Sequence, residues 1–370
     1  MSRLATSFGG VLALIRKEIL ALIKDPANRV ILFAPAFIQA ILFGYGATFD
    51  LTNVPYAVVD QSRSAASTEL LARLDGSGVF RRKATLASND DIADLINDGE
   101  VLLAISIPAD FESRLSAGDV APIQAILDGR NSSTALSAAR QIGTIVSDYA
   151  VSRGARPPIT IDRRAWYNPN LESRWTLMPA LVATLSFMQT LLLAALSVAR
   201  EREQGTFDQL LVTPLTPMQI LVGKAIPSIM VGMVQSTIIL VVIRFWFEIP
   251  VNGSYWLFYI GLLVFTGAGV GLGLSISALS LTMQEAMLYT FICIMPLVLL
   301  SGLITPIENM PEVLQVATYV NPLRFGIDFV RRVYLEGAGF TDIWFDFVPL
   351  LAMMAITVPH AAWLFRNRLT

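Results

Sequence analysis

The sequence has few of the side chains from which most catalytic and metal sites are built. Among its 370 residues there is one cysteine, Cys293, which excludes an intrachain disulfide and a cysteine-based metal cluster. There is also one histidine, His360, so a metal site with several histidines is excluded and triad chemistry is disfavoured. The sequence therefore predicts no cofactor and no metal ion.

Charged residues are scarce as well, at 15%, whereas hydrophobic residues make up 54% and the mean hydropathy is +0.59. This composition cannot cover a water-exposed surface, so we expect most of the chain to lie in a membrane. The 27 basic residues are balanced by 29 acidic residues, which gives a net charge of −2. This balance provides no basic field for nucleic acid, which we exclude as a partner.

Six runs without a charged side chain are long enough to cross about 30 Å of hydrocarbon as helices. They cover residues 30–49, 175–199, 225–243, a stretch within 249–284 that starts near Tyr255, 286–307 and 347–365. Apart from His360, these runs hold none of the ionisable groups that ion-coupled transport needs. The sequence predicts a mainly α-helical membrane protein with six transmembrane helices, the first at 30–49 and the other five within 175–370.

Residues 1–29 are predicted to form an amphipathic helix that lies flat on the cytoplasmic face of the membrane. Apolar residues recur at three- and four-residue spacing from Leu12 to Ile23, and the charged residues 16–18 interrupt any secretory signal. Basic residues flank the first span, the link between the second and third spans and the end of the last span. With six crossings these flanks fall on one side, so both termini are predicted to be cytoplasmic.

Residues 50–174, between the first two spans, have the composition of a soluble α/β domain and are predicted to lie outside the cytoplasm. Expected strands cover residues 56–59, 101–107 and 123–127, and expected helices cover 65–74, 90–97 and 132–151. No phosphate loop, metal spacing or nucleophile arrangement is present in this stretch. The domain is either a structural lid or docking surface, or a ligand-binding domain.

Two further features lie in the second half of the chain. Glycines at positions 267, 269, 271 and 273 give overlapping small-xxx-small pairs, which predict close helix packing. This packing occurs in a dimer seam, in a mobile contact that lines a pathway, or within one subunit. Prolines cut residues 306–335 into pieces too short to cross, which predicts short helices that re-enter the membrane from outside. Asp328, Arg331 and Arg332 in this stretch support a second hypothesis, a membrane enzyme acting on a lipid at the outer leaflet.

The cytoplasmic link at residues 200–218 differs from a passive turn. Three charged residues at the membrane surface are followed by a break and by a short amphipathic stretch with apolar side chains on one side. The residues concerned are Glu201, Arg202, Glu203, Gly205, Thr206, Phe207, Leu210 and Leu211. Such an element offers a soluble partner both charges and an apolar anchor.

The letters EREQGTFDQLLVTPL in this link, and NPLRF at 321–325, resemble the permease subunits of type-2 ABC exporters. The resemblance extends over the whole chain, from the amphipathic first helix to the re-entrant segment. It implies a non-catalytic permease of the bacterial inner membrane that forms the pathway as a dimer. A separate ABC ATPase subunit would drive it through the link at 200–218.

The resemblance also implies a second permease subunit, the same or homologous, and a periplasmic adaptor protein as partners besides membrane lipids.

One absence agrees with a separate ATPase. The sequence has no GxxxxGK[ST] loop, because Gly223 and Lys224 are followed by Ala225 and the first glycine is replaced by Met218. The transported substrate is not encoded in any feature of the sequence that we recognise.

Overall fold

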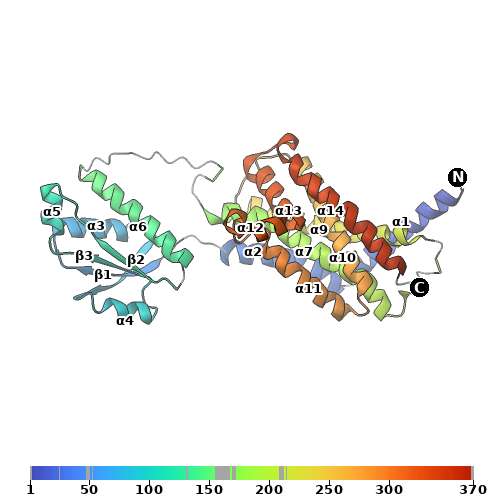
Figure 1. The fold of residues 1–370 in the computed structure, drawn as a ribbon, viewed down its shortest axis with the longest axis horizontal. Coiled ribbons are helices and arrows are strands. Elements are labelled where there is room, and N and C mark those ends of the chain that lie inside the picture. Colours follow the sequence, from blue (N-terminus) through green and yellow to red (C-terminus); the bar gives the residue numbers. More distant parts are fainter. Residues whose placement is uncertain are drawn as a thin grey trace. The chain divides into compact units, whose positions relative to one another are not determined.

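The structure is a computed structural model that describes residues 2–24, 26–46, 51, 53–130, 132–154, 167–168, 172–207, 212–213 and 215–367. It consists of two compact units (Figure 1). The helical unit comprises Met1–Thr48 and Ala165–Thr370, and the α/β unit comprises Phe49–Arg164.

The α/β unit is built on a four-stranded sheet with the order β2–β1–β3–β4. Strand β1 is parallel to both of its neighbours, and β4 is antiparallel to β3. The strands are β1 (Val54–Asp60), β2 (Phe80–Leu86), β3 (Leu103–Ile107) and β4 (Gln124–Leu127), and the helices are α3 (Ala65–Asp75), α4 (Ile92–Asn97), α5 (Phe111–Ala117) and α6 (Ser132–Ser152).

Both faces of this sheet are covered by helices. Because side chains alternate along a strand, Tyr56 and Val58 of β1 join the apolar core under α3 and α6, whereas Ala57 and Val59 join the core under α4. Figure 1 shows α3 and α6 on one side of the sheet and α4 on the other. Burial on both faces explains why β1 and β3 are nearly continuous apolar runs.

Three of the four strands overlap the predicted ones, but β2 and α5 were not predicted. The sequence of β2, FRRKATL, places three basic residues in succession, and its side chains are largely exposed. As the edge strand of the sheet, β2 needs few apolar residues, and charge on an edge discourages pairing with other chains.

The helical unit contains all the long apolar helices. Its elements are α1 (Ser2–Lys24), α2 (Pro26–Gly46), α7 (Ser173–Glu203), α9 (Pro217–Phe245), α10 (Tyr255–Leu279), α11 (Met283–Leu299), η1 (Ile307–Asn309), α12 (Glu312–Ala317), η2 (Thr318–Val320), α13 (Pro322–Arg331), the π-helical turn η3 (Arg332–Glu336) and α14 (Phe340–Asn367). Helix α7 packs against α9, α10, α11 and α13, while α14 packs against α10 and α13.

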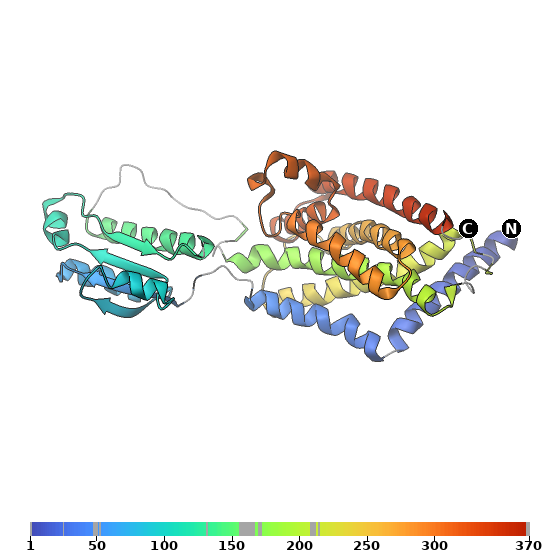
Figure 2. The same ribbon diagram turned by 60° about the horizontal axis from the view of Figure 1, so that its bottom comes forward.

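Among the residues that the structure describes, four helices are long and apolar enough to cross a membrane: α7, α9, α10 and α14. Shorter apolar helical stretches occur at Phe33–Gly46 in α2 and throughout α11. The protein is therefore mainly helical, with four long apolar helices and a small α/β sheet region. Figure 2 shows that α1 begins and α14 ends at the same end of the helical unit.

Two helix boundaries differ from the charge-free runs of the sequence. Helix α9 begins at Pro217, so Lys224 lies within the helix rather than before it. Helix α11 ends at Leu299, before the predicted boundary at 307, and Gly302 soon afterwards has a left-handed φ of +82°. Helix α1 ends at Lys24 and α2 starts at Pro26, so the last residues of the segment predicted at 1–29 belong to α2.

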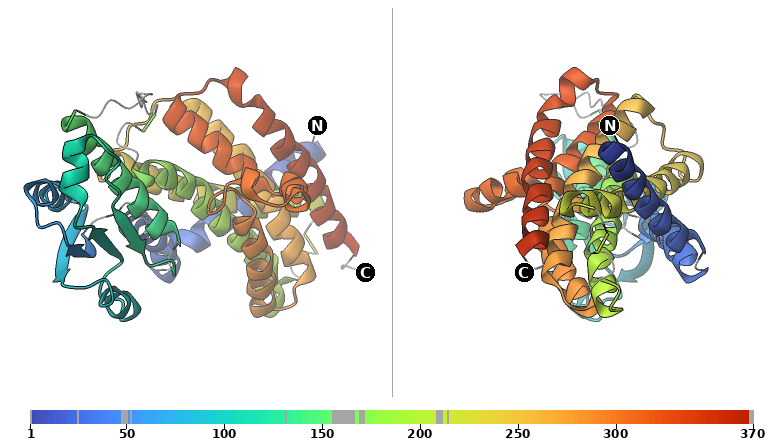
Figure 3. Two further views of the ribbon diagram at one scale, coloured as in Figure 1. Left: turned by 60° about the vertical axis from the view of Figure 1, so that its left-hand side comes forward. Right: turned by 90° about the vertical axis from the view of Figure 1, so that its right-hand side faces the viewer.

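Helix α1 runs obliquely to the other helices of its unit, as the right-hand view of Figure 3 shows. It packs mainly on α9. Leu14 on its inner face belongs to a buried apolar cluster that also contains Ile220 and Leu221 of α9 and Phe365 of α14. The amphipathic pattern of α1 thus provides an apolar stripe that attaches this helix to one end of the unit.

Candidate functional site

The charged link lies where α7 ends and α9 begins. Gly205 has a φ of +67°, a left-handed conformation that favours glycine, and the backbone N–H of Thr206 donates to the carbonyl oxygen of Glu201 at 2.9 Å. Helix α9 starts with a capping box, in which Thr216 and Gln219 bond each other's backbone. These end motifs fix the directions in which the chain leaves α7 and enters α9.

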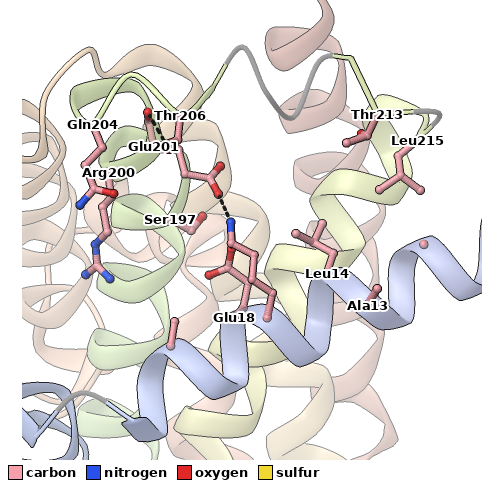
Figure 4. Close-up of a pocket in the computed structure, with 13 residues that line it drawn as sticks. Ala13, Leu14, Glu18, Ser197, Arg200, Glu201, Gln204, Thr206, Thr213 and Leu215 are labelled. Carbon is pink, nitrogen blue, oxygen red and sulfur yellow. Dashed lines mark hydrogen bonds and ion pairs between the residues drawn. The ribbon is translucent and has the colours of Figure 1, made fainter.

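Glu201, the first of the predicted link residues, is buried in a group of four ionic side chains. This ion cluster consists of Lys17 and Glu18 from α1, Glu201 from α7 and Lys224 from α9. The side chain of Lys224 is 0% exposed, and its Nζ lies 2.8 Å from Oε2 of Glu201 and 3.5 Å from Oε1 of Glu18. Lys17 donates to Oε1 of Glu201 at 3.1 Å (Figure 4).

The ion cluster is held by charge rather than by hydrogen bonds alone. Oε2 of Glu201 has no hydrogen bond of acceptable geometry, so its 2.8 Å contact with Lys224 is an ion pair. Lys224 does donate a hydrogen bond to the carbonyl oxygen of Ser197 at 3.1 Å. With two positive and two negative groups the ion cluster is neutral, which is the condition under which buried charges are tolerated.

Close approach of the backbones brings these charges together. A Cβ atom at Gly223 would lie 2.6 Å from Cδ2 of Leu14, and one at Gly10 would lie 2.8 Å from Cδ2 of Leu215. Glycine at both positions lets α1 lie directly on α9 and on the segment before it. The contact of α1 with α9 and with the segment before α9 therefore combines apolar packing with ion pairs.

Phe207 and Arg202 connect the link to further helices. The ring of Phe207 meets that of Phe365 edge-on, with centroids 5.6 Å apart, and the guanidinium of Arg202 lies 4.9 Å from the centre of the Phe207 ring. Arg202 donates to the carbonyl oxygens of Ala278 at 2.9 Å and Ser280 at 3.0 Å, where α10 ends. The start of the link thus contacts both α10 and α14.

Glu203 completes these contacts, because its Oε2 accepts from the backbone N–H of Met283 at 2.7 Å, in the first turn of α11. An anionic side chain at a helix N-terminus is electrostatically favourable. Leu210 and Leu211, the other predicted residues of the link, lie outside the described residues. The described residues of the link therefore contact α1, α9 and α14, the end of α10 and the start of α11.

A cavity of about 730 Å³ opens between α1, the end of α7 and the segment before α9 (Figure 4). Its walls combine apolar side chains such as Leu14 and Leu215 with charged ones such as Arg200 and Glu201. Such a mixed concave surface suits a protein element with an apolar anchor and a charged rim.

Sequence reasoning found Glu201 but missed its partners Lys17, Glu18 and Lys224. In the sequence, Lys224 stands directly before the charge-free run 225–243, and residues 16–18 interrupt an apolar stretch. A lysine in the second turn of an apolar helix was the available signal, because such a charge requires a partner.

The four glycines of α10 all face helices of this same chain. A Cβ atom at Gly267 or Gly271 would press on Met354 or Thr357 of α14. One at Gly269 or Gly273 would press on Phe187 or on the backbone of Leu191 in α7. These glycines thus let α10 pack closely between α7 and α14.

In the part of the chain that the structure describes, no group of three or more histidine, cysteine, aspartate or glutamate side chains is arranged to hold a metal ion.

Comparison with known proteins connects this geometry to transport. Residues 30–363 match the family described as ABC-2 family transporter protein. The chain is 40% identical, over 96% of its length and 98% of the relative's, to the probable multidrug ABC transporter permease YbhR of Escherichia coli (strain K12). It is 28% identical to the probable multidrug ABC transporter permease YbhS and 26% identical to the inner membrane transport permease YhhJ of the same organism, in each case over 91% of both chains.

Proposed function

The chain belongs to the ABC-2 family of transporter proteins, and from this premise we propose how ATP hydrolysis elsewhere moves its helices and what it exports. It is a permease subunit of an ABC transporter in the inner membrane, which it spans several times. It is non-catalytic, because a separate ATPase subunit hydrolyses the ATP. The lipid-enzyme hypothesis for Asp328, Arg331 and Arg332 is therefore set aside.

We propose that α2, α7, α9, α10, α11 and α14 are the six transmembrane helices. Under this assignment both termini and the ion cluster are cytoplasmic, and the α/β unit lies on the other side of the membrane. The supporting observation is that basic residues concentrate at the ends of α1 and α14 and at the end of α7. The short helices from η1 to α13 then form the re-entrant segment at the outer side.

The ion cluster and Phe207 are the proposed coupling elements. Coupling requires an element whose position both the ATPase and the permease helices influence. The link at 200–218 is joined by charge to α1 and α9 and by aromatic contact to α14, so pressure on it is transmitted to three other helices. The cavity of about 730 Å³ beside α1 is the proposed receptor for an element of the ATPase.

The proposed cargo is a class of amphiphilic, drug-like compounds, and the proposed assembly contains a second permease subunit. Two relatives that cover 91% or more of this chain are named as probable multidrug permeases. Those two relatives come from one organism, which favours a pair of homologous permeases over two identical copies. A periplasmic adaptor would then meet the α/β unit.

The coupling proposal is tested with Phe207→Ala. Loss of a half-buried aromatic anchor should cost about 2 kcal/mol or more in association with the ATPase, whereas loss of a rim charge should cost about 1 kcal/mol or less. We expect weaker co-purification with the ATPase subunit and slower ATP-driven export of a fluorescent amphiphilic dye, with normal insertion. Phe245→Ala, which removes a 77% exposed ring at the other end of α9, is the matched control.

Glu203→Ala is the companion variant, expected to have the smaller effect. If Phe207→Ala and Glu203→Ala both insert normally and both keep full ATPase association and export, the link is only a connector and the coupling proposal is wrong.

A further inference from the structure

A second cavity, of about 340 Å³, lies at the end of the helical unit opposite the ion cluster. It is enclosed by the segment after α11, by α13 and by the first turns of α14. Its place is fixed relative to α7, because Nε of Arg331 in its wall donates to the carbonyl oxygen of Thr176 in the first turn of that helix. Neither the family relationship nor the proposed coupling assigns a role to this cavity.

The Oδ2 atom of Asp346, in the wall of this cavity, is a buried acceptor without a hydrogen bond. The residue is 6% exposed, and among the described residues no donor bonds its Oδ2. The nearest cationic atom is Nη1 of Arg332 at 3.6 Å, and the same atom lies 3.9 Å from Oδ2 of Asp328. One guanidinium thus attracts two carboxylates from distances too long for hydrogen bonds.

The two arginines that line the cavity are already engaged with oxygens of the protein. Arg331 donates to the carbonyl oxygens of Thr176 at 3.3 Å and Gly302 at 3.4 Å. Arg324 donates to the hydroxyl of Thr318, and its guanidinium stacks 4.1 Å from the centre of the Tyr319 ring. The guanidinium N–H groups of these arginines therefore donate to oxygens of the protein itself. Asp328, Asp346 and Glu308 add three carboxyl groups to the cavity lining.

We propose that this cavity binds a protonated amine that belongs to a larger molecule. An ammonium group supplies one positive charge and up to three N–H donors, which match the unbonded Oδ2 of Asp346 and the neighbouring carboxylates of Asp328 and Glu308. An anion of similar size would instead be repelled by these carboxylates. Phe325 and Ile327 add an apolar wall for the carbon atoms next to the nitrogen.

The volume sets the size of the bound group. Pockets for complete drug-sized ligands span about 300–1,000 Å³, and a cavity of about 340 Å³ lies near the lower limit of this range. It therefore suits an amine with a short alkyl chain better than a large amphiphile. The amine could come from a lipid headgroup or from a soluble compound, and both present the same donors. The binding reaction requires no ATP, so its outcome is independent of the coupling proposal.

The test uses the full chain in phosphatidylcholine nanodiscs, whose lipid has no N–H donor. The probe is dansylcadaverine, a fluorophore with a pentyl chain that ends in a primary amine, and the matched compound is N-hexyl dansylamide, in which a methyl group replaces the amino group. We expect saturable binding of the amine by fluorescence anisotropy, after subtraction of empty nanodiscs, and no saturable binding of the methyl compound.

Asp346→Asn and Asp328→Asn should each raise the dissociation constant of the probe about tenfold or more, since each removes a charge-assisted contact. Asp328 has a 56% exposed side chain, so its variant tests the site even if the buried replacement at position 346 disturbs folding. Asp342→Asn, at an exposed position one turn earlier in α14, is the matched control and should leave the constant unchanged.

Equal binding of the amine and the methyl compound would overturn the proposal, and so would wild-type affinity in both Asp328→Asn and Asp346→Asn. Nanodiscs that contain phosphatidylethanolamine identify the source of the amine. Competition by this lipid would support a lipid headgroup as the occupant, whereas unchanged probe binding would support a soluble amine.

Discussion

Lys224 is the residue whose replacement most directly tests whether the ion cluster holds α1, α7 and α9 together. Lys224→Met keeps a long side chain but leaves Glu201, which is 8% exposed, with Lys17 as its remaining cationic neighbour. Breaking a buried ion pair by removing one partner costs about 3–5 kcal/mol. Because Lys17 is 61% exposed and still lies 3.1 Å from Glu201, we expect a smaller loss, about 2–4 kcal/mol.

A double-mutant cycle separates the ion pair from other effects of the substitution. Glu201→Gln alone should cost a similar amount, because it leaves the fully buried Lys224 with only the more distant Glu18. The double variant buries no charge at either position, while Lys17 and Glu18 can still pair with each other. Its loss should therefore be smaller than the sum of the single losses by about 2 kcal/mol.

The measurement is thermal unfolding of the purified chain in detergent. For a unit of this size, 1 kcal/mol corresponds to a change in Tm of about 2–4 °C, so each single variant should unfold roughly 5–15 °C lower than the wild type. Lys83→Met combined with Glu100→Gln is the control cycle, since this exposed pair at 3.1 Å should show a coupling below about 1 kcal/mol. Additive losses at Glu201 and Lys224 would refute the reasoning.

Two further predictions concern the packing of α10 and the titration of the α/β unit. Gly273→Ala should lower stability by about 1–3 kcal/mol in thermal unfolding, because the new Cβ would lie 2.5 Å from the backbone oxygen of Leu191. Gly267→Ala should cost less, because its nearest neighbour is the flexible side chain of Met354 at 2.9 Å, and equal losses would contradict this reasoning. Burial raises the pKa of Tyr56 from 10.0 to about 12, so the folded α/β unit retains a proton that the unfolded chain loses. Its free energy of unfolding should therefore fall as pH rises through that interval, and Tyr56→Phe should flatten the decline in denaturant titrations at several pH values.

The sequence predicts the strands β1, β3 and β4 because each is an apolar run bounded by turn residues. It fails at β2, where Arg81, Arg82 and Lys83 hide an edge strand that buries little. It also fails at the start of α9, because a count of charge-free residues stops at Lys224. Both failures have one physical cause, since a charge can occupy a regular element when solvent or a partner stabilises it.

The contacts of the candidate site are also hidden in the sequence, because they join residues that lie far apart along the chain. The letters EREQGTF identify the link by resemblance, but they do not reveal that Glu201 is bonded to Lys17, 184 residues earlier in the chain. Nor do they reveal that Phe207 packs on Phe365. Residue types can be read from the sequence, whereas their partners follow only from how α1, α9 and α14 converge.

Helix α7 connects the two ends of the helical unit that carry the proposals. Its 31 residues span about 46 Å, with Glu201 of the ion cluster near its end and Thr176, which binds Arg331 of the second cavity, near its start. Pro179 lies one turn after Thr176 and removes a backbone donor, so the helix is weakest between that contact and the buried stretch that follows. We therefore expect a displacement of α7 at the ion cluster to bend this helix at Pro179, three residues from the contact of Thr176 with Arg331.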